Sequence, residues 1–132
     1  MSVTRKSQRI LVIEDELDTA QTLAVLFKGM GHELEFAISA SAALECARRF
    51  RPNVVLIDLL LPDGDGCDLA RTLKQDAGLP GLTVIAMTGF GSEQLRRRAL
   101  KSGCDAYFQK PVDLAAVDAL LRSGPSRKSA AS

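Results

Sequence analysis

Three short, nearly continuous apolar runs, rich in β-branched residues, lie at residues 10–13, 54–57 and 83–87. Each run is followed by a polar residue. Unbroken apolarity over so short a run is typical of strands that are covered on both faces, as in a parallel sheet. The pattern therefore predicts three buried strands at the centre of the fold.

Between and after these runs, apolar residues recur with the period of an amphipathic helix. The five stripes are Leu17, Ala20, Ala24 and Phe27; Ala40, Ala43, Leu44 and Ala47; Leu69, Ala70 and Leu73; Leu95, Ala99 and Leu100; and Leu114, Val117, Leu120 and Leu121. Gly29 and Gly31 are expected to end the first helix. Two weaker strands are expected, an alternating edge strand at 33–37 and a short one at 106–109. Five strand–helix repeats predict an α/β fold with a doubly wound parallel sheet and helices on both faces.

Length and composition indicate one globular domain. The chain has 132 residues, 46% hydrophobic and 25% charged, which is too short for a two-domain enzyme and ordinary for a soluble fold. We expect a flexible segment at 1–8, the domain at 9–122, and a disordered tail at 123–132, where Ser, Gly, Pro and basic residues are frequent. The net charge of +1 gives no basic field of the kind that non-specific nucleic-acid binding requires.

Several classes of chemistry and location are excluded or disfavoured. No apolar run approaches the ~20 residues that span a bilayer, and the polar, basic N-terminus does not resemble a signal peptide, so we expect a cytoplasmic protein without membrane contact. The widely spaced Cys46, Cys67 and Cys104 are expected to be buried thiols. His32 is the only histidine, which argues against a histidine pair or a zinc site.

Polar residues with complementary chemistry occur at the ends of the predicted strands. They are Glu14, Asp15, Asp58, Thr88 and Lys110. Parallel strands bring their carboxyl ends to one edge of a sheet, which is where ligands bind in such folds. The sequence therefore predicts one site with three carboxylates, a hydroxyl and an ammonium group.

The charges of this set suggest a metal-assisted phosphoryl transfer. At an effective dielectric near 20, two like charges 4 Å apart repel by about 4 kcal/mol. Mg²⁺ offsets such repulsion, prefers oxygen ligands and leaves room for water and phosphate. Fixed positive groups around one carboxylate suit the charge distribution of phosphoryl transfer, which makes Asp58 the expected nucleophile.

Four motifs carry a resemblance to a known family. They are Ile10–Glu16, Val54–Gly66, Ala86–Gly89 and Ala106–Pro111, and in this order and spacing they cover the chain from Arg9 to Leu121. The sequence resembles a response-regulator receiver domain, the CheY-like family of two-component signalling. This resemblance implies a flavodoxin-like fold with strand order 2-1-3-4-5 and five helices.

The resemblance also implies a phosphoacceptor and a metal site. Asp58 would take a phosphoryl group from the phosphohistidine of a histidine kinase or a histidine phosphotransfer protein. Asp15 and Asp58, with the backbone carbonyl of Leu60, would hold Mg²⁺. Glu14 stands where aspartate is commoner and would reach the ion through water.

Further residues would bind the phosphoryl group and respond to it. Lys110 and Thr88 would contact phosphoryl oxygens, Gly89 would leave space for them, and the bond from Lys110 to Pro111 would be cis. Tyr107 occupies the family's aromatic switch position, so its ring would move inward when Thr88 is drawn to the phosphoryl group. The surface formed by the fourth helix, the fifth strand and the fifth helix would then change.

The expected partners are a phosphodonor and a downstream protein that the sequence does not identify. The chain would be a phosphoacceptor that assists its own phosphorylation and dephosphorylation, not an enzyme. It would be a monomer or weak dimer and would not bind DNA directly. The basic helix with Arg96, Arg97, Arg98 and Lys101 is expected to be a solvated face, with partner docking as the alternative.

Other interpretations fit the sequence less well. A haloacid-dehalogenase-type phosphatase has its nucleophile on the first strand and an acid–base aspartate two residues on, where Leu60 stands here. A dinucleotide or flavin site would need a glycine-rich loop after a different strand than the Gly89–Gly91 segment follows. Two alternatives within the family stay open: a C-terminal receiver fragment of a hybrid histidine kinase, and a phosphate-independent pseudo-receiver.

Overall fold

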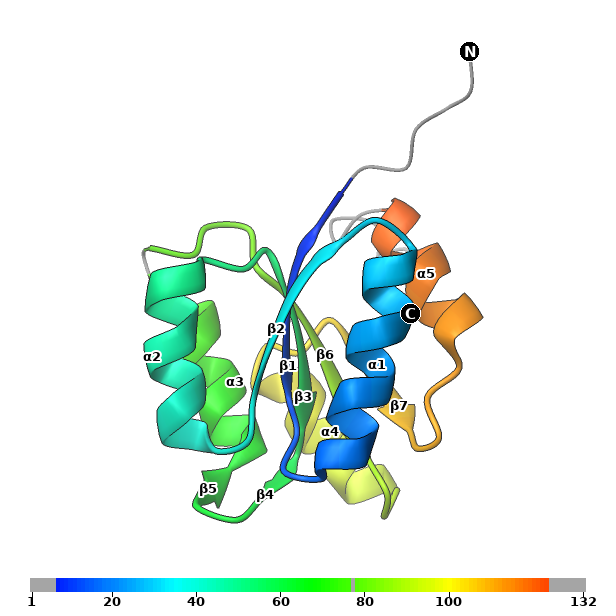
Figure 1. Ribbon diagram of the computed structural model, residues 1–132. Coiled ribbons are helices and arrows are strands. Elements are labelled where there is room, and N and C mark those ends of the chain that lie inside the picture. Colours follow the sequence, from blue (N-terminus) through cyan, green and yellow to red (C-terminus); the bar gives the residue numbers. More distant parts are fainter. Residues whose placement is uncertain (1–6, 77, 124–132) are drawn as a thin grey trace.

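A computed structural model describes residues 7–76 and 78–123 and has a central sheet of five parallel strands (Figure 1). The strands are β1 (Arg9–Ile13), β2 (Glu33–Ala37), β3 (Val54–Asp58), β6 (Thr83–Thr88) and β7 (Ala106–Gln109). Their order across the sheet is β2-β1-β3-β6-β7. The expected order 2-1-3-4-5 and the doubly wound, flavodoxin-like fold are confirmed.

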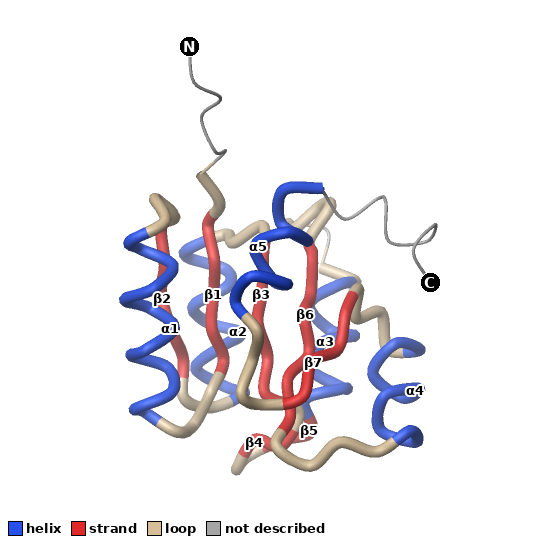
Figure 2. Tube along the Cα trace, turned by 90° about the vertical axis from the view of Figure 1, so that its right-hand side faces the viewer, coloured by secondary structure: helices blue, strands red, loops and turns tan. Residues whose placement is uncertain are grey.

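Helices cover both faces of the sheet (Figure 2). On one face lie α1 (Leu17–Gly29) and α5 (Leu114–Ser123); on the other lie α2 (Ala40–Phe50), α3 (Gly66–Lys74) and α4 (Glu93–Lys101). As predicted, α1 ends at Gly29, and the following Gly31 adopts a φ of 95°. Within residues 7–76 and 78–123, none of these helices has the length and apolarity needed to cross a membrane.

The central strands contribute to two separate apolar clusters, which explains their continuous apolar runs. In β1, Leu11 and Ile13 belong to the cluster on the side of α2 and α3, whereas Ile10 and Val12 belong to the cluster on the side of α1 and α5. All four side chains have an exposed fraction of 0%. Since successive strand residues point to opposite faces, a strand covered on both faces must be apolar throughout.

A small hairpin follows β3 that the sequence did not predict as strands. β4 (Leu60–Leu61) and β5 (Gly64–Asp65) form a two-stranded antiparallel sheet. Strands of two residues are too short to show a hydrophobic period, so the sequence analysis predicted neither of them. The Asp63 carboxylate in the turn accepts a hydrogen bond of 2.7 Å from the backbone N–H of Ala40, which ties the hairpin to the start of α2.

The predicted segment boundaries differ slightly from the observed elements. Ser7 and Gln8, assigned to a flexible segment, are hydrogen-bonded to the Gly31 carbonyl and the His32 ring, both at 3.0 Å. Helix α5 extends to Ser123, one residue into the predicted tail. The remainder of both terminal segments, residues 1–6 and 124–132, lies outside the described residues.

The three cysteines are buried thiols, as predicted, and none forms a disulfide. Burial raises the pKa of Cys104 to about 12, and burial together with the nearby Glu35 carboxylate raises that of Cys46 to about 11. At neutral pH both side chains are therefore protonated and act as small apolar residues.

Candidate functional site

The five residues expected at the sheet edge come from the carboxyl ends of four strands. Glu14 and Asp15 follow β1, Asp58 is the last residue of β3, Thr88 is the last residue of β6, and Lys110 follows β7. These strands end together at the lower edge of the sheet in Figure 1. The edge is where the parallel topology places a binding site.

Lys110 is the positive centre of this cluster. Its Nζ lies 3.1 Å from Oδ2 of Asp58 and also forms an ion pair with Oε1 of Glu14. Burial acts to lower the pKa of Lys110, but its hydrogen bonds to Glu14 and Asp58 outweigh this effect and leave the pKa raised. The ammonium group therefore stays charged at neutral pH and neutralises part of the carboxylate repulsion.

Glu14 is fully buried, although it is ionisable. Burial raises its pKa, against the opposing hydrogen bonds from Lys110 and from the backbone N–H of Glu16, the latter 3.0 Å from Oε2. Both Glu14 oxygens thus already have donors. Each oxygen keeps a second acceptor site, which a water molecule bound to an ion, or the ion itself, could occupy.

The carboxylates can bind a metal ion. Oxygen atoms of Glu14, Asp15 and Asp58 all lie within 4.8 Å of one another. Asp15 is exposed and Asp58 is buried, with an exposed fraction of 6%. Oδ1 of Asp58 accepts a hydrogen bond of 2.9 Å from the backbone N–H of Leu60, which fixes its orientation. Hard oxygen ligands that converge at this spacing suit a small divalent cation such as Mg²⁺.

Thr88 is fully buried on the strand next to Asp58. Its Oγ1 accepts a hydrogen bond of 3.1 Å from the backbone N–H of Phe90, and its carbonyl accepts one of 2.8 Å from the backbone N–H of Lys110. A Cβ placed at Gly89 would meet no atom within 4 Å. Gly89, directly after Thr88, therefore borders open space.

Tyr107 pairs with Ala86 in the adjacent strand, two residues before Thr88. Its ring is half-buried and packs against the apolar cluster on the α2 and α3 side. The buried Tyr107 hydroxyl has no hydrogen-bond partner among the described residues. The peptide bond between Lys110 and Pro111 is cis, as expected.

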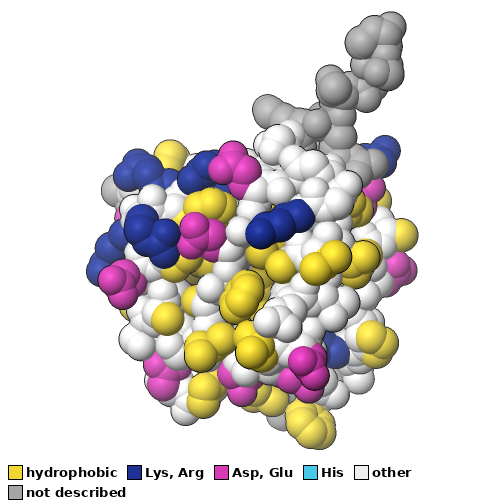
Figure 3. All heavy atoms as spheres, in the orientation of Figure 1, with side chains coloured by type: hydrophobic (Ala, Val, Ile, Leu, Met, Phe, Trp, Pro, Cys, Tyr) yellow, Lys and Arg dark blue, Asp and Glu magenta, His cyan; other side chains and the backbone are white. Residues whose placement is uncertain are grey.

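Apolar side chains surround the acidic cluster at this edge. Leu17, Ile38, Leu60 and Phe90 follow or begin near strand ends and expose between 49% and 78% of their surface. In Figure 3 most visible basic side chains gather instead at the upper left, over the C-terminal end of α2. The edge thus offers a mixed acidic and apolar surface to an incoming molecule.

Sequence reasoning missed one polar feature beside the site. Asp65 accepts hydrogen bonds from the backbone N–H groups of Cys67 and Asp68 at the start of α3, and its other oxygen lies 2.6 Å from Nη2 of Arg98. Arg98 is exposed, in agreement with the expected solvated face, but it also forms this ion pair, which the sequence did not predict. An aspartate directly before Gly66 is a recognisable helix cap, but its partner is 33 residues away in sequence.

Comparisons with known proteins agree with this geometry. The family profile described as "Response regulator receiver domain" matches residues 10–122. The chain is 36% identical over 104 residues to the DNA-binding response regulator MtrA of Mycobacterium tuberculosis, covering 79% of this chain and 44% of MtrA. It is 30% identical over 108 residues to the polar-differentiation response regulator DivK of Brucella ovis, covering 82% of this chain and 88% of DivK. The chain thus spans about half the length of MtrA and most of DivK.

Solved structures show the same fold. A response regulator receiver domain protein (CheY-like) from Methanospirillum hungatei superposes with a TM-score of 0.83 at 25% identity, covering 96% of this chain and all of that one. The BeF3-activated N-terminal receiver domain of Klebsiella pneumoniae RstA gives a TM-score of 0.79 at 25% identity, covering 89% and 97% of the two chains.

Proposed function

The chain belongs to the response regulator receiver domain family, and from this premise we propose that it accepts a phosphoryl group on Asp58 from a phosphohistidine. The donor is a histidine kinase or a histidine phosphotransfer protein. The observation that carries the proposal is the contact of Lys110 with both Asp58 and Glu14, with Asp15 alongside. Receiver domains are signalling domains, so the chain acts as a switch and not as a classical enzyme.

In the transfer step, a carboxylate oxygen of Asp58 attacks the phosphorus atom of the donor. The new O–P bond forms as the P–N bond to the donor imidazole breaks. The leaving imidazole nitrogen takes up a proton from solvent, and the products are an acyl phosphate on Asp58 and a neutral histidine. Lys110 donates a hydrogen bond to one phosphoryl oxygen. Positive groups held in place before the reaction stabilise the charge of the transition state without reorganisation.

Asp15 and Asp58, with the Leu60 carbonyl, would hold Mg²⁺, and Glu14 would contact it through water. The donor set fits the ion because it is made of oxygen ligands with a surplus of negative charge. The bound ion supplies neutralisation of the phosphoryl oxygens. In its absence Lys110 is the positive charge in contact with Asp58 and Glu14.

The response to phosphorylation would use Thr88 and Tyr107. The Thr88 hydroxyl would turn towards a phosphoryl oxygen across the open space at Gly89, and the Tyr107 ring would move into the vacated volume. Phosphorylation would in this way shift an existing equilibrium between two surfaces. Each tenfold change in that equilibrium needs about 1.4 kcal/mol of differential stabilisation.

The downstream partner would be a protein that recognises the changed surface. MtrA is named a DNA-binding regulator, but this chain aligns with only 44% of it. A net charge of +1 gives this domain no strong attraction to DNA, so direct DNA binding by these residues is not proposed. We propose a cytoplasmic location, monomeric or weakly dimeric. A place within a hybrid histidine kinase is a second candidate.

The test is phosphorylation by acetyl phosphate in the presence of Mg²⁺, followed by intact-mass spectrometry. We expect one adduct of about 80 Da, the mass of a phosphoryl group, on the wild type and none on Asp58→Asn. A folded wild-type protein that gains no adduct from acetyl phosphate or from any phosphorylated kinase would contradict the proposal and favour a phosphate-independent pseudo-receiver.

A further inference from the structure

Helix α4 has little apolar anchoring. Ala99 is its only fully buried residue, whereas four residues of α1, four of α2 and five of α3 are buried. A helix that buries so little apolar surface is held mainly by its polar contacts, and its position can change at small cost in free energy. The contacts that fix α4 therefore decide where it lies.

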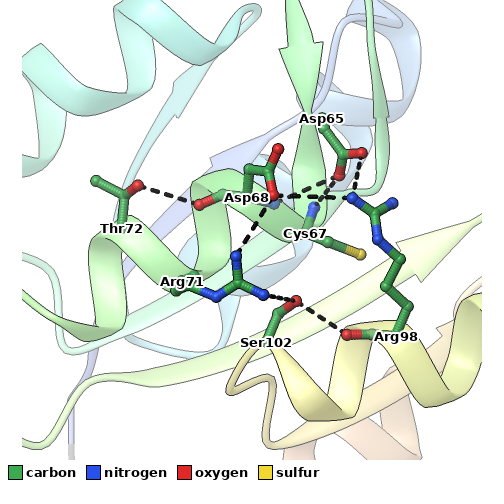
Figure 4. A network of polar contacts seen from close by, with 7 residues as sticks. All are labelled: Asp65, Cys67, Asp68, Arg71, Thr72, Arg98 and Ser102. Carbon is green, nitrogen blue, oxygen red and sulfur yellow. Dashed lines mark hydrogen bonds and ion pairs between the residues drawn. The ribbon is translucent and has the colours of Figure 1, made fainter.

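The principal polar contact of α4 runs to α3 and the hairpin. Arg98 extends from α4 and places Nη2 2.6 Å from Asp65 and 3.7 Å from Asp68 (Figure 4). A second, weaker link joins Arg71 of α3 to the Ser102 hydroxyl at the end of α4, at 3.4 Å. The other arginines of the helix, Arg96 and Arg97, pair with Glu93 inside α4. Among residues 7–76 and 78–123, Arg98 is the one arginine of α4 that forms an ion pair with a residue outside the helix.

Asp65 connects Arg98 to the phosphoacceptor through the backbone. It is the β5 residue that pairs with Leu60 of β4, and the Leu60 N–H donates to Oδ1 of Asp58 at 2.9 Å. Although burial acts to raise it, the pKa of Asp65 is lowered by Arg98 and by the N–H groups at the start of α3. The carboxylate that Arg98 holds is therefore ionised at neutral pH.

The ion pair lies at a groove between the hairpin and α4. The groove is open to solvent, has a volume of about 410 Å³, and its lining includes Asp15, Leu60, Leu95, Asp65 and Arg98. Because this space is unfilled, displacement of α4 relative to the hairpin meets no close-packed core. The Asp65–Arg98 contact spans the two sides directly.

We propose that the Asp65–Arg98 ion pair couples the position of α4 to the turn that would bind Mg²⁺ after Asp58. The connection runs from Arg98 to Asp65, across the β4–β5 pairing to Leu60, and from there to Asp58. Arg98 is a positioning residue in this scheme and does not touch the reacting atoms. The proposal rests on the function proposed for Asp58 and adds a route that does not pass through Thr88 and Tyr107.

The direction of the coupling follows from the pairing. The intact ion pair holds the hairpin, and with it Leu60, in its arrangement beside Asp58 and Asp15. An ion that binds this arrangement stabilises the ion pair in return, because coupling between two sites is reciprocal. Ion binding should therefore hold α4 more firmly, and loss of Arg98 should weaken ion binding.

The first measurement is amide hydrogen exchange of residues 93–101 without ligand, in the wild type, Arg98→Gln and Arg97→Gln. Both variants lose one positive charge from the same helix, but Arg97 pairs only within α4. We expect exchange in Arg98→Gln to be about two- to fivefold faster, the range of a surface ion pair, and exchange in Arg97→Gln to match the wild type. Equal exchange in the two variants would overturn the proposal.

The second measurement is the dissociation constant for Mg²⁺, by calorimetric titration of the same proteins. We expect it to rise about two- to fivefold in Arg98→Gln. Removal of a positive charge near the acidic cluster would by itself tighten binding, so an electrostatic effect alone has the opposite sign and appears in Arg97→Gln. A constant in Arg98→Gln no higher than in Arg97→Gln would overturn the coupling.

Asp65→Asn provides an independent variant, because asparagine can still accept the hydrogen bonds that cap α3 but has no charge for Arg98. It should reproduce both effects of Arg98→Gln, and the double variant should add little to either. Additive effects would contradict the coupling. A wild-type protein that neither binds Mg²⁺ nor is phosphorylated would instead refute the function proposed for Asp58. This outcome is distinct from failure of the coupling, in which Arg98→Gln and Arg97→Gln show the same exchange and the same affinity for Mg²⁺.

Discussion

At the scale of single residues, Gly66, the first residue of α3, lies in close contact with the backbone beside the site. A Cβ added there would lie 2.5 Å from Cα of Leu59 and 2.7 Å from the carbonyl oxygen of Asp58. Both atoms belong to the backbone at Asp58 and Leu59, so neither can move aside without displacing Asp58. Glycine is required at this position by space and not by its backbone angle.

Gly66→Ala should therefore lower the free energy of unfolding by about 1–3 kcal/mol, the usual cost of overpacking, and should slow phosphorylation of Asp58. Gly29→Ala is the matched control, since a Cβ at Gly29 meets nothing within 4 Å; it should leave stability unchanged or slightly increased. Chemical denaturation measures the free energy of unfolding of both variants. Equal stability of the two variants would contradict the close packing at Gly66.

The buried cysteines allow a prediction about reactivity. With a pKa of about 12 for Cys104 and about 11 for Cys46, only about one thiol in a thousand or fewer is ionised at pH 8. A disulfide reagent should thus react with almost no thiol of the folded protein. After denaturation it should react with three thiols per chain, one for each cysteine. In the denatured Cys46→Ala variant it should react with two. Rapid reaction of the folded protein would show that one thiol is accessible.

At the scale of elements, the helices differ in what holds them. Ser39 caps α2 and Ser92 caps α4 through hydrogen bonds to backbone N–H groups at 3.2 Å and 3.0 Å. Four residues of α2 are buried, but only one of α4 is. The cap therefore accounts for a larger part of the local stability of α4.

Ser92→Ala and Ser39→Ala should each cost about 1 kcal/mol of helix stability, with different local results. In Ser92→Ala the amide protons of residues 93–101 should exchange faster while the rest of the protein is unaffected. In Ser39→Ala the protection of α2 should fall only with global stability, because its apolar face keeps it in place. Hydrogen exchange followed by NMR distinguishes local from global loss of protection in the two variants. A loss of protection confined to α2 in Ser39→Ala would contradict this account.

The same comparison of elements shows what sequence alone could predict. The buried strands were evident because both faces are covered, which removes polar residues from runs such as 54–57. The site residues followed, because a parallel topology brings all strand ends to one edge. The β4–β5 hairpin was missed, since two-residue strands carry no period. The contacts of Lys110 with Glu14 and of Arg98 with Asp65 join residues 96 and 33 positions apart, and no local pattern encodes such pairs.

At the scale of the whole molecule, ion binding should stabilise the fold. The carboxylates of Asp15 and Asp58 come from different strands and are brought together only in the folded chain, so an ion that they hold favours the folded state. At a hundredfold excess over its dissociation constant, a ligand of the folded state adds about 2.7 kcal/mol.

Millimolar Mg²⁺ should thus raise the melting temperature by several degrees, measured by calorimetry against a monovalent salt of equal ionic strength. Asp15→Asn should reduce this increase, and because the substitution removes one of three mutually repelling carboxylates, the variant itself should melt at or above the wild-type temperature without the ion. An identical increase in the wild type and Asp15→Asn would mean that the ion acts elsewhere.

The ammonium group of Lys110 also affects how the chain folds before any metal ion is bound. It serves as a permanent internal counterion to Asp58 and Glu14, so part of their mutual repulsion is relieved by the polypeptide itself. Zinc fingers and many other small metal-binding domains fold only when the metal is supplied. With Lys110 in contact with Asp58 and Glu14, we expect this chain to reach its native state without a metal ion, so that the proposed binding of Mg²⁺ and of a phosphodonor would follow folding.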